Sequence, residues 1–268
     1  MIDWVQAVWL ALVQGLTEFL PISSSAHLVI PSLILQWPDQ GLAFDVAVHV
    51  GTLTAVVAYF RSELVTLAKG TVAGLGRREM NEELRMVGYL GVASIPVAVV
   101  GFAAGQFVES NLRSLPVIAA TTLLFGVLLG YADRHTRHVS QFRALALPAA
   151  LLIGLAQMLA IVPGVSRSGV TITAALLLNL DRQTAARFSF LLSIPVIAGA
   201  GSLKGWELGQ AQIAPNWWLL GISALVAAIT AYACIALFLK LLDRVGLMPF
   251  VYYRVVLSLL LLALWLWQ

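Results

Sequence analysis

Six long runs of apolar residues alternate with short polar segments along the chain. Each run holds about 16 to 23 residues, close to the 20 or so that an α-helix needs to cross a bilayer. The runs cover residues 42–60, 86–104, 116–131, 188–203, 217–239 and 250–267. The pattern therefore predicts six transmembrane helices.

Two further apolar stretches are interrupted by polar residues in their middle. Residues 4–35 are broken at 21–27, and residues 144–180 are broken at 163–168. A proline followed by hydroxyl residues frees backbone groups that lipid cannot satisfy, so such a break requires shelter inside protein or water. Each stretch is therefore predicted to form a re-entrant hairpin of two broken helices.

Basic residues gather in three of the connecting segments, 61–85, 134–143 and 240–244, which predicts that these face the cytoplasm. The segments 106–115 and 204–216 carry one basic residue each, and six spans place both outside. One hairpin then enters from each face. The chain is predicted to be one membrane domain built as an inverted repeat, with halves at about 1–131 and 144–268.

Composition agrees with an all-α polytopic membrane protein. Of 268 residues, 60% are hydrophobic and 11% charged, and the net charge of +3 resides in the loops, with no basic face that would suit nucleic acid. The first twenty residues carry Asp3, Gln14 and Glu18 and no basic start, so we do not expect a removable signal peptide. The lone Cys234 is interpreted as a small buried side chain.

The first break carries chemistry of two kinds. Gln14 and Glu18 lie four residues apart and share a helix face, where they would coordinate a divalent ion or a phosphate-bound water, or else bond a neighbouring hairpin. Ser23, Ser24 and Ser25 precede a half-helix and would serve as caps, but a serine three residues from His27 with a carboxylate nearby favours nucleophilic or proton-transfer chemistry.

The second break is the sharper signal for an anion. Arg167 offers a fork of donors, its neighbours Ser166, Ser168 and Thr171 offer hydroxyls, and Gly164 permits close backbone approach. The half-helix that follows presents free N–H groups. This combination predicts a phosphate or pyrophosphate site, because an unpaired structural arginine at this depth is costly.

Polar residues elsewhere in the spans are weaker candidates. Asp45 and His49 share one side of a span near its outer end, where they either border the pocket of the predicted phosphate site or simply lie at the membrane–water interface. Tyr253 and Arg254 fall near the inner end of the last span. For Arg254 the favoured interpretation is that the side chain reaches back to the membrane surface.

At these two clusters the chain resembles the undecaprenyl pyrophosphate phosphatase family of bacterial inner membranes, the bacitracin-resistance type. The string from Glu18 to His27 and the string from Pro163 to Thr171 carry the likeness, and it extends over essentially the whole chain. The resemblance implies removal of the terminal phosphate from a long-chain polyprenyl pyrophosphate, at the outer face, to recycle the carrier lipid for peptidoglycan. It also implies a divalent cation, Mg²⁺ or Ca²⁺.

Carried over by residue, the family's first motif falls on Gln14 and Glu18, although some members have glutamate where this chain has Gln14. Glu18 is then the expected metal ligand, His27 the proton shuttle and Arg167 the charge-stabilising group. Ser24 is the favoured nucleophile, and attack by His27 or by water remains open. Gln14, Ser23, Ser25, Gly164, Ser166, Ser168 and Thr171 are expected to contact the substrate.

A different class of function also fits. Opposed hairpins in an inverted repeat are typical of transporters, so a polyprenyl-phosphate flippase is the alternative, whereas a purely structural subunit would have no use for Arg167. The expected partners are the lipid substrate and the bilayer. A homodimer is compatible with the sequence, which does not fix the oligomeric state.

Overall fold

The computed structural model describes residues 2–136, 145–210 and 216–267, and the regular structure in these residues is helical. Six helices are long and apolar enough to span a membrane, in agreement with the six predicted runs. They are α3 (Gly41–Tyr59), α5 (Glu82–Asn111), α6 (Leu115–His135), α9 (Arg182–Gln210), α10 (Trp217–Val245) and α11 (Met248–Trp267).

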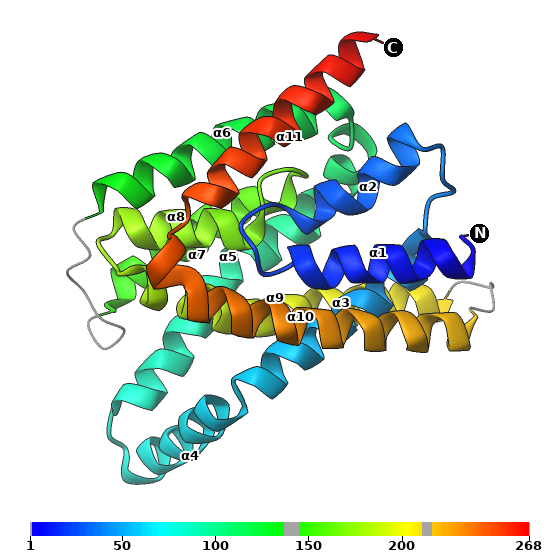
Figure 1. Ribbon diagram of the computed structural model, residues 1–268. Coiled ribbons are helices and arrows are strands. Elements are labelled where there is room, and N and C mark those ends of the chain that lie inside the picture. The colour runs from blue at the N-terminus through cyan, green and yellow to red at the C-terminus, as the bar shows by residue number, and fades with distance from the viewer. Residues whose placement is uncertain (1, 137–144, 211–215, 268) are drawn as a thin grey trace.

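Both interrupted stretches form helical hairpins. The first consists of α1 (Trp4–Thr17) and α2 (Ser24–Ile34). The second consists of α7 (Leu147–Gln157), the short 3₁₀ helix η2 (Met158–Ile161) and α8 (Arg167–Leu177). Figure 1 shows the hairpins open toward opposite ends of the molecule, with their turns facing each other in its interior. How deeply each hairpin enters a membrane remains a prediction.

The two halves of the chain repeat one order of elements in opposite directions. In each half a hairpin is followed by three long helices, and each element of the second half runs opposite to its counterpart (Figure 1). Helix α4 (Arg61–Arg77) is an addition of the first half. This order is the one expected from the predicted inverted repeat, whose boundaries at 1–131 and 144–268 remain predictions.

The two turns also share unusual backbone geometry. Ser23 and Ser166, which precede α2 and α8, have positive φ angles of 74° and 73°. In each turn the hydroxyl of this serine lies 3.2 Å from that of the serine two residues later, Ser25 or Ser168. Non-glycine residues rarely adopt such angles, and strained turns persist where surrounding packing holds them. Both turns are therefore held in a specific shape.

Two glycines that occupy matching places in the hairpins allow close helix contacts. A methyl group on Gly15 of α1 would lie 2.7 Å from the Ala227 carbonyl oxygen of α10. On Gly154 of α7 it would lie 2.5 Å from the Ala93 carbonyl oxygen of α5. Small residues at helix contacts let backbones pack directly in membrane proteins. The first helix of each hairpin is thereby fixed against a spanning helix.

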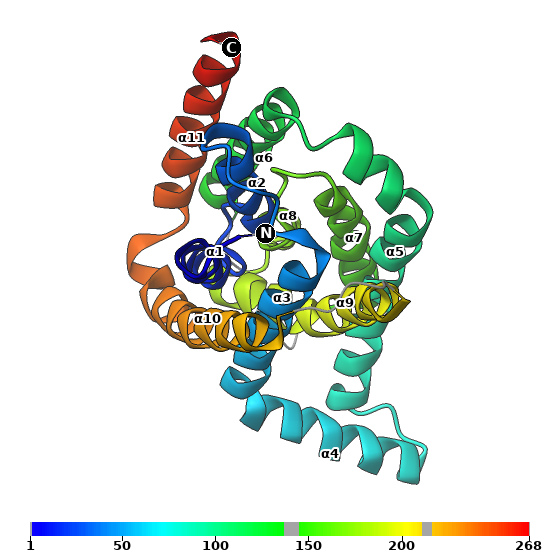
Figure 2. The ribbon, with the colours of Figure 1, turned by 90° about the vertical axis from the view of Figure 1, so that its right-hand side faces the viewer.

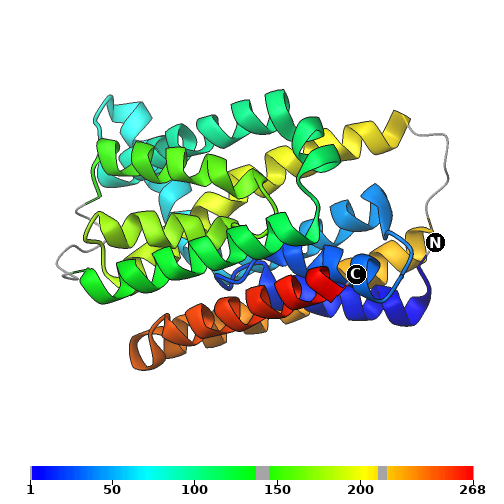
Figure 3. The ribbon, with the colours of Figure 1, turned by 90° about the horizontal axis from the view of Figure 1, so that it is seen from above.

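The basic segments lie at one end of the molecule. Helix α4 and the C-terminal ends of α6 and α10 gather there, while the C-terminal ends of α5 and α9 lie at the other end (Figures 1 and 3). Viewed along the bundle, α4 extends sideways beyond the other helices (Figure 2). Arg137 and Arg143 fall outside the described residues. The assignment of this end to the cytoplasm remains a prediction.

Candidate active site

The turns of the two hairpins meet through a pair of opposite charges. Arg167 begins α8 and Glu18 follows the last residue of α1. One terminal nitrogen of the guanidinium donates to Glu18 Oε1 at 3.1 Å, although 149 residues separate the two. A second contact between the turns runs from the Ser168 hydroxyl to the Leu20 carbonyl oxygen at 2.9 Å. The acid of one hairpin therefore faces the cation of the other.

Glu18 is the centre of a hydrogen-bond network. Its Oε2 accepts a 2.7 Å hydrogen bond from the Ser24 hydroxyl and a 3.0 Å bond from the Gln14 side-chain amide. Only 7% of the Glu18 side chain is exposed, so its charge is compensated mainly by these donors and by Arg167. A serine hydroxyl bonded to a carboxylate is the arrangement of a nucleophile with its general base.

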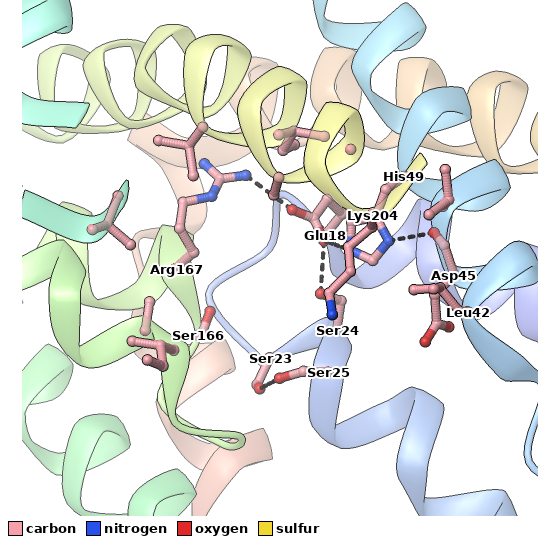
Figure 4. A pocket seen from close by; sticks show the side chains of 18 residues that line it. Glu18, Ser23, Ser24, Ser25, Leu42, Asp45, His49, Ser166, Arg167 and Lys204 are labelled. Carbon is pink, nitrogen blue, oxygen red and sulfur yellow. Dashed lines mark hydrogen bonds and ion pairs between the residues drawn. The ribbon is translucent and has the colours of Figure 1, made fainter. Parts of the chain in front are cut away.

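Arg167 is fixed from several sides yet still faces the cavity. Its other terminal nitrogen donates to the Ser189 carbonyl oxygen at 3.0 Å, and the guanidinium carbon lies 5.7 Å from the centre of the Phe19 ring. Because an arginine carries five N–H donors, these two contacts leave donors free for an oxyanion. The side chain lines the same pocket as Glu18 (Figure 4).

The pocket between the turns has a volume of about 340 Å³. Its polar lining includes Ser23, Ser24, Ser25 and Ser166 besides Glu18 and Arg167, and α3, α5 and α9 complete the walls. Asp45 in the second turn of α3 and Lys204 near the end of α9 also line it, so the pocket extends toward the end opposite the basic segments (Figures 1 and 4).

His49 brings an imidazole close to this network. Its Nε2 lies 3.8 Å from Glu18 Oε2, and its Nδ1 is 2.7 Å from the Asp45 carbonyl oxygen. Both His49 and Asp45 line the pocket, which confirms the first of the two interpretations that the sequence left open. A polar pair on one side of an otherwise apolar span was the signal for it.

His27 occupies a different place from the one its sequence position suggests. Its Nε2 is 2.6 Å from the Tyr253 hydroxyl and its Nδ1 is 2.7 Å from the Ser23 carbonyl oxygen, and its ring stacks on that of Tyr253. His27 lies three residues beyond Ser24 in α2, but its ring bonds Ser23 and Tyr253, whereas the Ser24 hydroxyl bonds Glu18. His27 is not among the pocket-lining residues.

Four predicted substrate contacts lie behind the pocket rather than in its lining: Gln14, Gly164, Ser168 and Thr171. The Thr171 hydroxyl is buried and bonds the Ser189 hydroxyl at 2.7 Å, and Ser168 bonds the opposite turn. At Gly164 an added methyl group would lie 2.1 Å from the Thr121 hydroxyl oxygen, so this glycine permits a close approach to α6. These residues shape the turns, and direct substrate contact remains a prediction.

A serine caps the half-helix of the second turn, and not that of the first turn, where the sequence suggested capping. Ser166 Oγ accepts a 3.1 Å hydrogen bond from the Gly169 backbone N–H and so caps α8. Ser23 makes no such bond, and the Ser24 hydroxyl is directed to Glu18 instead. The hydroxyl of Ser24 is therefore available for chemistry, whereas that of Ser166 combines capping with a place in the pocket wall.

Arg254 corrects the interpretation given to it from the sequence. The side chain does not reach the membrane surface: it is fully buried, with 0% exposure, and donates only to backbone carbonyl oxygens. The position of Arg254 near the end of a span suggested an interfacial arginine. The sequence did not indicate otherwise, because the acceptors that hold the side chain inside come from segments far away in the chain. Backbone acceptors leave no mark in the residue pattern.

Cys234 is buried, as expected, and its thiol contacts the Leu16 carbonyl oxygen at 3.2 Å. Cys234 is not among the residues that line the pocket. Replacement of Cys234 with serine keeps a donor of similar size, so we expect catalytic turnover within about threefold of the unmodified protein. Steady-state turnover in detergent is the measurement, and a large loss would reveal a reactive thiol.

The family resemblance also implies a divalent cation, and the donors present can be compared with what such an ion needs. Among the described residues no three His, Cys, Asp or Glu side chains cluster as metal ligands. The pocket does hold two carboxylates, Glu18 and Asp45. Mg²⁺ is commonly bound by one or two carboxylates together with substrate phosphates, so these residues fit an ion that arrives with a pyrophosphate.

Comparison with known proteins identifies the family. The family model described as "Bacitracin resistance protein BacA" matches residues 7–260. The chain belongs to the BacA family. Similar BacA relatives are proteins named undecaprenyl-diphosphatase from Alcanivorax borkumensis and Teredinibacter turnerae, each 53% identical over 97% of this chain and 98% of the relative. The protein of that name from Hahella chejuensis is 53% identical over 95% of this chain and 96% of its own length.

Proposed function

We propose that this BacA-family protein hydrolyses undecaprenyl pyrophosphate to undecaprenyl phosphate and inorganic phosphate. The observation that supports this most directly is the meeting of the Ser24–Glu18 pair with Arg167 in one pocket. That pocket combines a nucleophile, a base and a cation, which are the groups that phosphoryl transfer requires. The names of the relatives supply the lipid substrate.

In the proposed reaction the Ser24 oxygen attacks the terminal phosphorus while Glu18 accepts the hydroxyl proton. The anhydride P–O bond breaks and undecaprenyl phosphate leaves. Glu18 passes the hydroxyl proton to solvent. Water then attacks the phosphoserine, Glu18 takes a proton from the water and gives it to the Ser24 oxygen as the bond between that oxygen and phosphorus breaks, and inorganic phosphate is released. Arg167 and the N–H groups at the start of α8 stabilise charge on the phosphoryl oxygens.

We propose for His27 a role different from the proton shuttle that the family resemblance implied. With both ring nitrogens bonded to Ser23 and Tyr253, His27 would hold the backbone of the first turn, and Glu18 is the nearer base for Ser24. Attack by His27 or by a water remains the competing scheme. Tryptic peptides of enzyme quenched during turnover should carry phosphate on Ser24, and phosphate on His27 instead would reject the assignment.

We further propose that the reaction takes place at the outer face of the inner membrane. The support is that the pocket extends toward the end with few basic residues, which the positive-inside rule assigns to the outside. The isoprenoid tail would stay in lipid beside the helices. Carrier-lipid recycling for peptidoglycan synthesis and bacitracin resistance are the cellular roles that follow from this proposal.

A divalent cation, Mg²⁺ or Ca²⁺, is proposed as cofactor, with Glu18 as its principal protein ligand. When bound, such an ion neutralises charge on the phosphoryl oxygens. We expect EDTA to lower the rate of phosphate release from long-chain polyprenyl pyrophosphate by about tenfold or more, and excess Mg²⁺ or Ca²⁺ to restore that rate. Malachite-green detection of phosphate is the measurement, and full activity in chelator would exclude the cation.

A lipid flippase is the alternative, and the opposed direction of the two hairpins is the observation that favours it. Two assays separate the candidates. Phosphate release by detergent-solubilised protein supports the hydrolase. Transfer of labelled polyprenyl phosphate across proteoliposome bilayers, with no phosphate released from the pyrophosphate, would favour the flippase.

A further inference from the structure

Arg254 is a buried cation that contacts both hairpin turns. Its Nε donates to the Thr122 carbonyl oxygen of α6 at 3.1 Å. One terminal nitrogen donates to the Pro21 carbonyl oxygen in the first turn at 3.1 Å. The other donates to the carbonyl oxygens of Gly164 and Val165 in the second turn, at 2.9 and 3.1 Å. One side chain on α11 therefore bonds both turns and a third helix.

These contacts are costly for a role in packing alone. Arg254 forms no ion pair with a carboxylate in the part of the chain that the structure describes, and its side chain has no exposure. A buried charge is stabilised only when its donors are satisfied, and here four of the five N–H donors have carbonyl acceptors. An apolar residue would fill the same space without that cost.

The turns need such a support because they contain few bonds of their own. Pro21 and Pro163 lack backbone N–H groups, and both turns pass through positive φ angles at Ser23 and Ser166. Only the Arg167–Glu18 pair and the Ser168–Leu20 bond join the turns directly among the described hydrogen bonds. Among the described hydrogen bonds, the Pro21 and Val165 carbonyl oxygens have no donor other than Arg254, and the Gly164 carbonyl oxygen has only the Thr122 hydroxyl at 3.4 Å besides.

We propose that Arg254 is the positioning residue of the active site: by binding carbonyl oxygens of both turns, it sets the separation at which Arg167 meets Glu18. It lines no part of the pocket and so acts through the turns rather than on the substrate. The neighbouring Tyr253 supports the first turn through its contact with His27. This inference rests on the proposed phosphatase function for its kinetic test, but its structural test does not.

The kinetic test is a double-mutant cycle. Arg254→Lys keeps the charge but loses the fork, and Arg254→Met keeps the length without the charge. We expect either variant to lower kcat by about 10²-fold, as a small misplacement of reacting groups does. In either Arg254 variant, Arg167→Ala should then lower kcat by only about tenfold, against about 10³-fold in the unmodified protein. The reason is that a misplaced Arg167 guanidinium already stabilises the transition state poorly.

Ser258→Ala is the matched control. Ser258 lies one turn further along α11, is also fully buried, and donates to the Ala119 carbonyl oxygen of α6 at 2.7 Å, away from both turns. Its loss weakens the same helix contact without releasing a turn. We expect nearly unchanged kcat and an undiminished cost of Arg167→Ala in the Ser258→Ala background. If Arg254 only packed α11 against α6, its own variants should likewise leave the cost of Arg167→Ala undiminished.

Hydrogen–deuterium exchange supplies a readout that needs no activity. In either Arg254 variant, peptides that cover residues 18–27 and 162–169 should exchange faster by about tenfold, whereas α6 and α10 should not. Equal exchange in the turns, or full additivity with Arg167→Ala, would overturn the proposal. Failure of both variants to fold would assign Arg254 to folding as a whole and overturn it too. An unmodified protein that releases no phosphate refutes the function, while the exchange result still decides the role of Arg254.

Discussion

Replacing Arg167 with alanine is expected to lower kcat for undecaprenyl pyrophosphate by about 10³-fold or more. The guanidinium is held by Glu18, by the Ser189 carbonyl oxygen and by contact with the Phe19 ring, so it is oriented before substrate arrives. Preorganised charge that faces the transferring phosphoryl group stabilises the transition state more than the bound ground state. The loss should therefore appear mainly in kcat, with a smaller change in KM.

Two variants make this result specific. Arg167→Lys restores the charge but not the two-pronged donor geometry, and we expect it to recover at most about a tenth of the lost activity. Arg182→Lys alters an arginine that pairs with Asp133 at 2.6 Å on the first turn of α9, and Arg182 does not line the pocket. That control should keep turnover within about threefold. Activity of Arg167→Ala within tenfold of the unmodified protein would reject the role.

Replacing Ser24 with alanine is expected to lower kcat to a similar extent, by about 10³-fold or more. Its hydroxyl is the one serine oxygen in the first turn bonded to Glu18, at 2.7 Å, so its removal deletes the nucleophile of the proposed reaction. Rapid quench with substrate labelled at the terminal phosphate should show a labelled protein in the unmodified enzyme and none in the variant.

Ser25→Ala is the matched comparison for Ser24. Ser25 lines the same pocket, but its hydroxyl contacts Ser23 at 3.2 Å and not Glu18. We expect a loss of about tenfold or less, expressed mainly in KM, because a neutral contact with the headgroup is removed while the nucleophile remains. Equal loss in the two variants would mean that the first turn tolerates no change, and would remove the support for Ser24.

The polar clusters led to the right region because membrane proteins rarely leave such residues in lipid. Glu18 and Arg167, separated by 149 residues, were each predicted as site residues, and the structure brings them together at 3.1 Å. The helix around His27 was the part that sequence spacing could not resolve. A serine and a histidine three residues apart suggested one site, but in the structure Ser24 bonds Glu18 and His27 bonds Tyr253.

By itself, the sequence determined the elements: apolar runs of membrane length, two runs broken at prolines, and charged loops of alternating character. These follow from the cost of exposing backbone and charge to hydrocarbon, which is a local property of the residues. Only the tertiary structure decided that His49 lies beside Glu18 and that Arg254 holds both turns. Packing brings His49 of a spanning helix to Glu18, and it brings backbone carbonyl oxygens of both turns to Arg254. Every residue carries a backbone carbonyl oxygen, so the sequence does not mark which ones will bind an arginine.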